Sequence, residues 1–205
     1  MSLYRHHVFP WVLEAVMSRR AFRRLRREAL APVSGRLLEI GLGTGLNLAY
    51  YPEGTRKIVG VDSNPGVVGI AHRRAAKHDI EIEHHQLSAE QLPFEAASFD
   101  TVVSTFTLCS IPDVQMALAE VRRVLRPGGE FVFLEHGLSP EPAVARWQRR
   151  FNPAWKLVGD GCHLDRDATE EVRRSGLAIE RVRNFYLPKS PRFAGYMYLG
   201  AAKRP

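Results

Sequence analysis

Apolar positions follow a repeating order from about residue 36 onward. Short runs rich in branched apolar residues occupy positions 36–40, 57–61, 80–84, 100–104 and 130–135. Segments with helical signals lie between them, at positions 45–51, 65–77 and 113–125. Strands that alternate with helices are joined by right-handed crossovers and form a parallel sheet covered on both faces. The pattern therefore predicts an α/β fold.

The end of the chain follows a different pattern. Residues 167–175 are expected to form a helix, and residues 177–186 and 193–202 are expected to form strands. The loop between these two strands is too short to hold a crossover helix, so the last strand should pair antiparallel. We therefore predict a Rossmann-like, doubly wound sheet of seven strands, six parallel and one antiparallel.

A basic segment precedes the first predicted strand. Residues 11–30 have the pattern of one amphipathic helix with Val12, Val16, Phe22, Leu25 and Ala29 on its apolar side. Its arginines crowd together, at Arg19, Arg20, Arg23, Arg24, Arg26 and Arg27. The helix is either a lid with solvated arginines or a surface that contacts an anionic membrane or substrate. We expect residues 1–33 to form an N-terminal helical cap on one compact domain, residues 34–205.

Length and composition fit this organisation. The chain has 205 residues, of which 45% are hydrophobic, enough for one compact domain with a core. It contains no run of about 20 apolar residues that could cross a membrane, and residues 8–17 do not resemble a signal peptide. A cytoplasmic location is expected, and the oligomeric state stays open. The net charge of +7 permits nucleic acid, anionic lipid or an anionic substrate as partner.

The cysteines and histidines show no metal-ligand spacing. Cys109 and Cys162 are far apart in the sequence, and a disulfide would be unusual in a cytosolic enzyme. Both are expected to be small buried residues. No metal site is predicted.

A glycine loop follows the first predicted strand. Gly41, Gly43 and Gly45 alternate with other residues and permit a tight turn that a ligand can approach closely. The loop lacks the Gly-Lys-Ser/Thr of a phosphate-binding P-loop. Its third glycine also comes one residue too early for the dinucleotide fingerprint. The loop alone predicts only that a ligand meets the backbone here.

Two further signals lie where neighbouring strands end. Asp62 ends the second strand, where an acid can accept both hydroxyls of a ribose. The segment 88–94 follows the third strand. In open α/β sheets ligands bind at the carboxyl ends of the strands. The three signals together favour a ligand with a ribose; the alternative for Asp62 is a helix cap.

These motifs carry a family resemblance that covers about residues 35–135. They are Leu-Glu-Ile-Gly-Leu-Gly-Thr-Gly at 38–45, Val-Gly-Val-Asp at 59–62, Ala-Glu-Gln-Leu-Pro-Phe at 89–94, Ser-Phe-Asp-Thr-Val-Val at 98–103 and Val-Leu-Arg-Pro-Gly-Gly at 124–129. The chain resembles the class I S-adenosylmethionine-dependent methyltransferases, most of all the branch with ubiquinone and menaquinone biosynthesis enzymes. The resemblance implies S-adenosylmethionine as cofactor and S-adenosylhomocysteine as product.

The resemblance also implies a set of cofactor-binding residues. Glu39 would orient the loop and the methionine amine, Asp62 would hold the ribose, and Ser88 stands where the family often has an aspartate facing the adenine. The whole set is Glu39, Gly41, Gly43, Thr44, Gly45, Asn47, Asp62, Ser63, Asn64, Ser88, Ala89, Glu90, Thr105, Phe106 and Leu108.

The methyl acceptor is constrained by the second half of the chain. Residues 107–113 lack the Asn/Asp-Pro-Pro-aromatic motif of enzymes that methylate exocyclic base nitrogens. No RNA-binding module is attached, so nucleic acid is not expected as a partner. Segments 108–111, 131–137, 147–148, 151–155 and 160–166 resemble the methyltransferase-like group that contains alkyl-thiol methyltransferases. This resemblance implies a small, hydrophobic acceptor, with a thiol as the leading hypothesis.

A thiol acceptor reacts as its thiolate, and an unperturbed thiol has a pKa of about 8.5. A base would therefore help. His136, expected with Glu135 at the mouth of the pocket, is the first catalytic candidate because histidine titrates near neutrality. Asp160 could orient it or act through water. The alternative is that His136 only forms local hydrogen bonds.

Two other functions stay open at this point. The first is methylation of a lipid amine or quinone, with the basic N-terminal helix in peripheral contact with an anionic membrane. The second is a non-catalytic nucleotide-binding or RNA-associated module, which only the positive charge favours.

Overall fold

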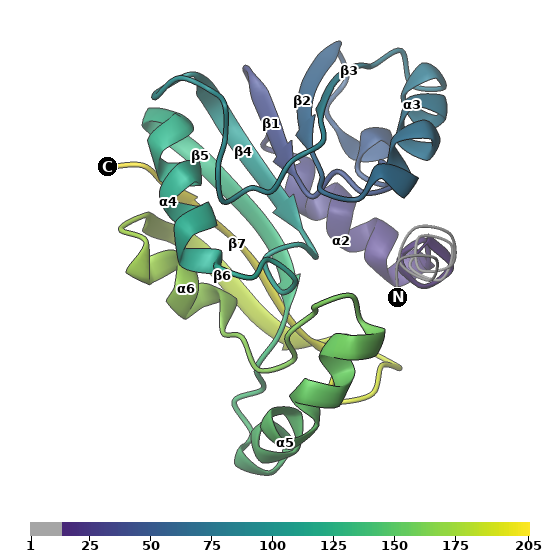
Figure 1. Cartoon of the computed structure of the whole chain (residues 1–205), viewed down its shortest axis with the longest axis vertical. Helices are drawn as coiled ribbons and strands as arrows, with labels where there is room; N and C mark the ends of the chain where they lie inside the picture. Colours follow the sequence, from purple (N-terminus) through teal and green to yellow (C-terminus); the bar gives the residue numbers. More distant parts are fainter. Residues whose placement is uncertain (1–13) are drawn as a thin grey trace.

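One mixed sheet organises the protein, for which a computed structural model describes residues 14–205 (Figure 1). Its seven strands lie in the order β3-β2-β1-β4-β5-β7-β6. All run parallel except β7, which pairs antiparallel with both β5 and β6. The strands are β1 Leu37–Ile40, β2 Lys57–Val61, β3 Glu81–His85, β4 Phe99–Thr105, β5 Leu125–His136, β6 Ala178–Tyr186 and β7 Tyr196–Lys203. The predicted fold class is confirmed.

Helices cover both faces of the sheet (Figure 1). One face packs against α4 and α6, and the other packs against α2 and α3. The helical elements are α2 Arg20–Leu30, η2 Leu48–Tyr50, η3 Pro65–Val67, α3 Val68–Ala76, α4 Val114–Val124, α5 Pro142–Val158 and α6 Ala168–Arg174. In the described part of the chain, no helix has the length and apolar character needed to cross a bilayer.

Two predicted helices are shorter than expected. The prediction of a helix at 45–51 is wrong except for the single turn η2. The helix cannot continue because Tyr51 is extended and Pro52 follows it. The basic helix at 11–30 is interrupted at Arg19, which is extended with φ −61° and ψ 150°. Of its predicted apolar residues, Phe22, Leu25 and Ala29 are buried but Val16 is exposed. Residues 11–13, including Val12, lie outside the described residues.

The sequence does not predict helix α5, because polar residues of this helix are buried and large apolar residues are exposed. Its buried positions include polar Gln148 and Asn152, whereas Trp147 and Phe151 are exposed. A proline, Pro153, also stands inside the helix. The helix extends away from the sheet at the end where β5 stops (Figure 1). The chain returns from it toward the sheet before α6.

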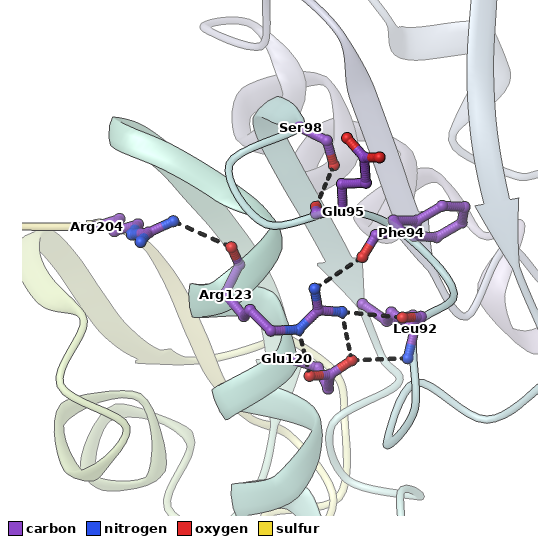
Figure 2. A network of polar contacts seen from close by, with 7 residues as sticks. All are labelled: Leu92, Phe94, Glu95, Ser98, Glu120, Arg123 and Arg204. Atoms are coloured by element: carbon purple, nitrogen blue, oxygen red, sulfur yellow. Dashed lines mark hydrogen bonds and ion pairs between the residues drawn. The ribbon is translucent and has the colours of Figure 1, made fainter.

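The connection between β3 and β4 is held in place by α4 (Figure 2). Arg123 donates hydrogen bonds to the carbonyl oxygens of Phe94 and Leu92, at 2.7 and 2.9 Å. The Glu120 carboxylate accepts from the Leu92 amide at 2.8 Å and also pairs with Arg123. Arg204, near the end of the chain, donates to the Arg123 carbonyl at 3.0 Å. The connection between β3 and β4 contains no helix, so these contacts with α4 hold its backbone in place.

We expect Arg123→Met to lower the free energy of unfolding by about 1–3 kcal/mol, because two backbone carbonyls lose a charged donor. The matched control is Arg173→Met, which removes an exposed pair with Glu170. Such surface pairs contribute about 0–1 kcal/mol. Urea denaturation of both variants measures the difference. Equal losses would show that the two backbone contacts of Arg123 add no stability.

Candidate functional site

A cavity of about 520 Å³ opens at the carboxyl ends of the central strands. The predicted cofactor residues line it, with two exceptions. Gly45 lies outside it, where an added Cβ would meet the Leu48 side chain at 2.6 Å, and Leu108 is fully buried in the core. The predicted residues that line the cavity are Glu39, Gly41, Gly43, Thr44, Asn47, Asp62, Ser63, Asn64, Ser88, Ala89, Glu90, Thr105 and Phe106.

The glycine loop turns sharply over the end of β2. Gly41, Gly43 and Gly45 have φ of +72°, +54° and +77°, a region that glycine enters without strain. The Gly41 amide donates to the Val61 carbonyl at 2.7 Å. An added Cβ on Gly43 would meet only the Gly41 carbonyl oxygen, at 3.9 Å. The loop therefore presents bare backbone to the cavity at Gly43.

Asp62 links the glycine loop to the end of β2. Its two carboxylate oxygens accept hydrogen bonds from the amides of Gly43 and Asn64, each at 2.8 Å. Burial raises the pKa of Asp62, and the two backbone hydrogen bonds oppose that change. Each carboxylate oxygen has two lone pairs, so one acceptor position remains on each. This geometry fits a pair of ribose hydroxyls.

Glu39 lines the cavity and is almost fully buried. Its carboxylate accepts from the Asn47 side chain at 2.8 Å and from the Tyr51 hydroxyl at 2.7 Å. Burial raises the pKa of Glu39 to about 7, against the two hydrogen bonds and the charge of Arg26. Sequence reasoning missed Tyr51, which belongs to no recognised motif.

The expectation that Arg26 is one of several solvated arginines is wrong. Arg26 is only 4% exposed, whereas Arg23, Arg24 and Arg27 are exposed. Helical spacing places it on the same side as Phe22 and Ala29, and that spacing was the signal available in the sequence. Burial lowers the pKa of Arg26 to about 10.

The Arg26 guanidinium faces the cavity and approaches the Phe106 ring, 5.3 Å from its centroid. One of its nitrogens donates to the Met17 carbonyl at 3.3 Å, and its Nε has no hydrogen-bond partner among the described residues. A buried cation, Arg26, and a buried carboxylate, Glu39, thus line one cavity. They match the carboxylate and ammonium of a free amino-acid group.

Comparison with known proteins decides the family. The methyltransferase domain family matches residues 38–133. Rat thiol S-methyltransferase TMT1B is 34% identical over 184 residues, covering 82% of this chain and 74% of the relative. Human thiol S-methyltransferase TMT1A is 35% identical over 170 residues, covering 78% and 69%. The chain belongs to the S-adenosylmethionine-dependent methyltransferases.

A solved structure supports the same fold. The Thermotoga maritima S-adenosylmethionine-dependent methyltransferase, described as a possible histamine N-methyltransferase, aligns with a TM-score of 0.68. It is 18% identical and covers 99% of this chain and 98% of its own. This likeness shows the fold, and S-adenosylmethionine is the cofactor of the methyltransferase family to which the chain belongs.

The N-terminal segment is tied to the glycine loop of the methyltransferase. The Glu14 carboxylate accepts from the Thr44 hydroxyl at 2.5 Å and pairs with Arg74 at 2.6 Å. Arg74 also donates to the Thr44 carbonyl at 2.6 Å. These contacts join three segments next to the cofactor cavity.

The segment after β3 presents Ser88 and Glu90 in a fixed arrangement. The Ser88 hydroxyl donates to the Glu90 carboxylate at 2.6 Å, and the same carboxylate accepts from the Asp113 amide at 2.7 Å. The carboxylate of Glu90 is thus engaged within the protein. The oxygen of Ser88 keeps an acceptor position for a ligand.

The two catalytic candidates occupy different places. Asp160 lines the cavity, in a left-handed backbone conformation with φ +49°, and its charge contributes to the raised pKa of Asp62. His136 is not among the lining residues, and its Nε2 lies 3.1 Å from Cys162 Sγ. Glu135 is fully buried and accepts from the amides of Thr107 and Leu108 at 3.0 Å. The expected position of Glu135 and His136 at the pocket mouth is therefore wrong.

Proposed function

We propose that this methyltransferase transfers a methyl group to the sulfur of small hydrophobic thiols. The observation that carries this proposal is the similarity to thiol S-methyltransferases, which extends over 82% of the chain and so beyond the cofactor-binding half. Apolar side chains on the cavity wall also suit a hydrophobic acceptor. They include Met17, Leu87, Phe106, Ile111 and Pro112.

We propose a cofactor orientation from the contacts in the cavity. Asp62 accepts the ribose hydroxyls with the lone pairs that its backbone contacts leave free. The Arg26 guanidinium, on the cavity wall, binds the methionine carboxylate, and Glu39 lies on the side of the methionine ammonium. Ser88 faces the adenine amino group. Gly43, with no side chain toward the cavity, lets the cofactor approach the backbone.

The reaction requires a thiolate, and Asp160 is the proposed proton acceptor. In the transfer a sulfur–carbon bond forms at the acceptor while the methyl–sulfonium bond breaks, so no covalent enzyme intermediate is needed. The proton of the thiol leaves before or during that step. Asp160 is the candidate on the cavity wall and would take this proton through a water molecule. His136 is the less favoured base because it faces Cys162.

Matched acceptors test the proposed substrate class. The protein is incubated with S-adenosylmethionine and 1-octanethiol, octylamine or 1-octanol, which share one alkyl chain. We expect S-adenosylhomocysteine and a methylated product with the thiol alone, identified by mass spectrometry. Methylation of octylamine without methylation of the thiol would instead favour the lipid-amine alternative. This alternative has support of its own, because a relative named phosphatidylethanolamine N-methyltransferase, from Cereibacter sphaeroides, is 34% identical over 134 residues.

A further inference from the structure

Two cysteines and one histidine, distant in the sequence, converge behind the cofactor cavity. Cys109 follows β4, His136 ends β5, and Cys162 lies between α5 and α6. The sulfur atoms and the histidine ring nitrogen that each could offer a ligand all lie within 4.8 Å of one another. Both cysteines are free and buried. We propose that Cys109, His136 and Cys162 form a binding site for a borderline or soft divalent cation of the zinc type.

The donor set has the chemistry of such a cation. Zinc binds cysteine sulfur at about 2.3 Å and histidine nitrogen at about 2.0–2.1 Å in a tetrahedral arrangement. Ligand atoms around one tetrahedral zinc ion therefore stand about 3.5 Å apart. The His136 Nε2 and Cys162 Sγ atoms are already separated by 3.1 Å. The other donor pairs lie within 4.8 Å, so small side-chain rotations would bring the three donors around one ion.

The backbone around the cluster is fixed by other contacts. The amide of His163 donates to the Cys109 carbonyl at 2.8 Å, which joins the two cysteine segments directly. Arg166 donates to the carbonyl oxygens of Leu108 and Ile111, on either side of Cys109. The cysteines are thus held near each other without a bridging ion. A site arranged in advance loses less conformational entropy when it binds a ligand.

Charge balance favours a cation at this place. A divalent ion would displace the protons of the two thiols and neutralise both thiolates, and a neutral imidazole adds no charge, so the occupied site would carry no net charge.

Three protein ligands leave a fourth position for water or another donor. The sequence neighbours Ser110 and Gly161 line the cofactor cavity. Cation binding would therefore fix the wall of the cavity to which Asp160 belongs. This inference replaces the expectation that the chain has no metal site, and it does not depend on the identity of the methyl acceptor.

Cobalt titration tests the site on the full chain. The reduced protein is stripped with a chelator and titrated anaerobically with Co²⁺, whose bond to thiolate gives a charge-transfer absorption that other ligands do not produce. We expect this absorption to saturate near about one equivalent and to disappear when Zn²⁺ is added. Zn²⁺ should also raise the melting temperature of the wild-type protein.

Variants assign the ligands. Cys109→Ser, Cys162→Ser and His136→Gln should each weaken Zn²⁺ affinity by at least about tenfold, measured against a chromophoric chelator. The matched control is His78→Gln, at an exposed position beyond α3, which should bind Zn²⁺ like the wild type. Circular dichroism identifies any variant that fails to fold, and the wild-type cobalt spectrum does not depend on the variants.

Three results would overturn the proposal. One is a reduced wild-type protein without the thiolate–cobalt absorption. Another is the same absorption in a Cys109→Ser/Cys162→Ser double variant. The third is a Cys109–Cys162 disulfide in the purified protein together with no Zn²⁺ binding after reduction, which would make the pair a redox-active dithiol instead.

Discussion

Asp62→Ala is expected to weaken S-adenosylmethionine binding by at least about tenfold, equivalent to about 1.4 kcal/mol or more. Two effects combine. The alanine cannot accept the ribose hydroxyls, and it also releases the amides of Gly43 and Asn64, which Asp62 holds at 2.8 Å. The loop then loses the shape that the cofactor meets. Isothermal titration calorimetry without any acceptor measures the affinity directly.

The control for this variant is Glu53→Ala. Glu53 is an exposed acid that lines a different cavity, together with Arg36 and Lys57 from the amino-terminal sides of β1 and β2. Its removal changes the net charge equally but touches no cofactor contact, so affinity should stay close to wild type. An affinity within about twofold of wild type in Asp62→Ala would refute the ribose assignment.

The features that the sequence predicted correctly are local ones. Alternating strands and helices depend on short-range periodicity, so the sheet and its antiparallel β7 followed from residues close together in the chain. The glycine loop and Asp62 are separated by one crossover, and both lie at the ends of adjacent parallel strands. Because the register of parallel strands brings such ends together, the cofactor cavity could be predicted without coordinates.

The features that the sequence did not predict depend on long-range packing. Arg26 became a cavity residue because α2 lies across the sheet with its charged residue turned inward, against the usual exposure of arginine. Cys109, His136 and Cys162 meet only because the segment after α5 folds back against the loop after β4. Helical spacing could have placed Arg26 on the buried side of α2, but it does not indicate which part of the protein that side covers. The cysteine–histidine cluster has no periodicity, and no short motif records which distant segments pack together.

Alanine at Gly43 is expected mainly to weaken cofactor binding, whereas alanine at Gly41 is expected mainly to lower stability. Both glycines have positive φ, so both substitutions carry the backbone strain of a left-handed residue, about 1–2 kcal/mol. At Gly43, which lines the cavity, the added methyl group would meet no atom closer than 3.9 Å. Gly43→Ala should therefore cost only this strain in stability, yet weaken cofactor binding by at least about tenfold because the methyl group occupies cofactor space.

At Gly41 the same methyl group would lie 2.0 Å from the Thr107 hydroxyl and 2.6 Å from its Cβ. Thr107 cannot rotate clear of such a contact, and its amide holds the buried Glu135. Overpacking of this kind costs about 1–3 kcal/mol in addition to the backbone strain. Gly41→Ala should therefore have the lower free energy of unfolding, measured in urea.

Gly54→Ala separates the two contributions. Gly54 has φ +90° and no atom within 4 Å of an added Cβ, so this variant reports strain without steric contact or cofactor contact. We expect Gly43→Ala to match Gly54→Ala in stability and to differ from it in calorimetric affinity. If Gly43→Ala binds S-adenosylmethionine as tightly as Gly54→Ala does, the cofactor does not approach the backbone at Gly43. If Gly41→Ala is as stable as Gly43→Ala and Gly54→Ala, the loop that holds Thr107 moves to accommodate the added methyl group. The packing of Thr107 against Gly41 is then not rigid.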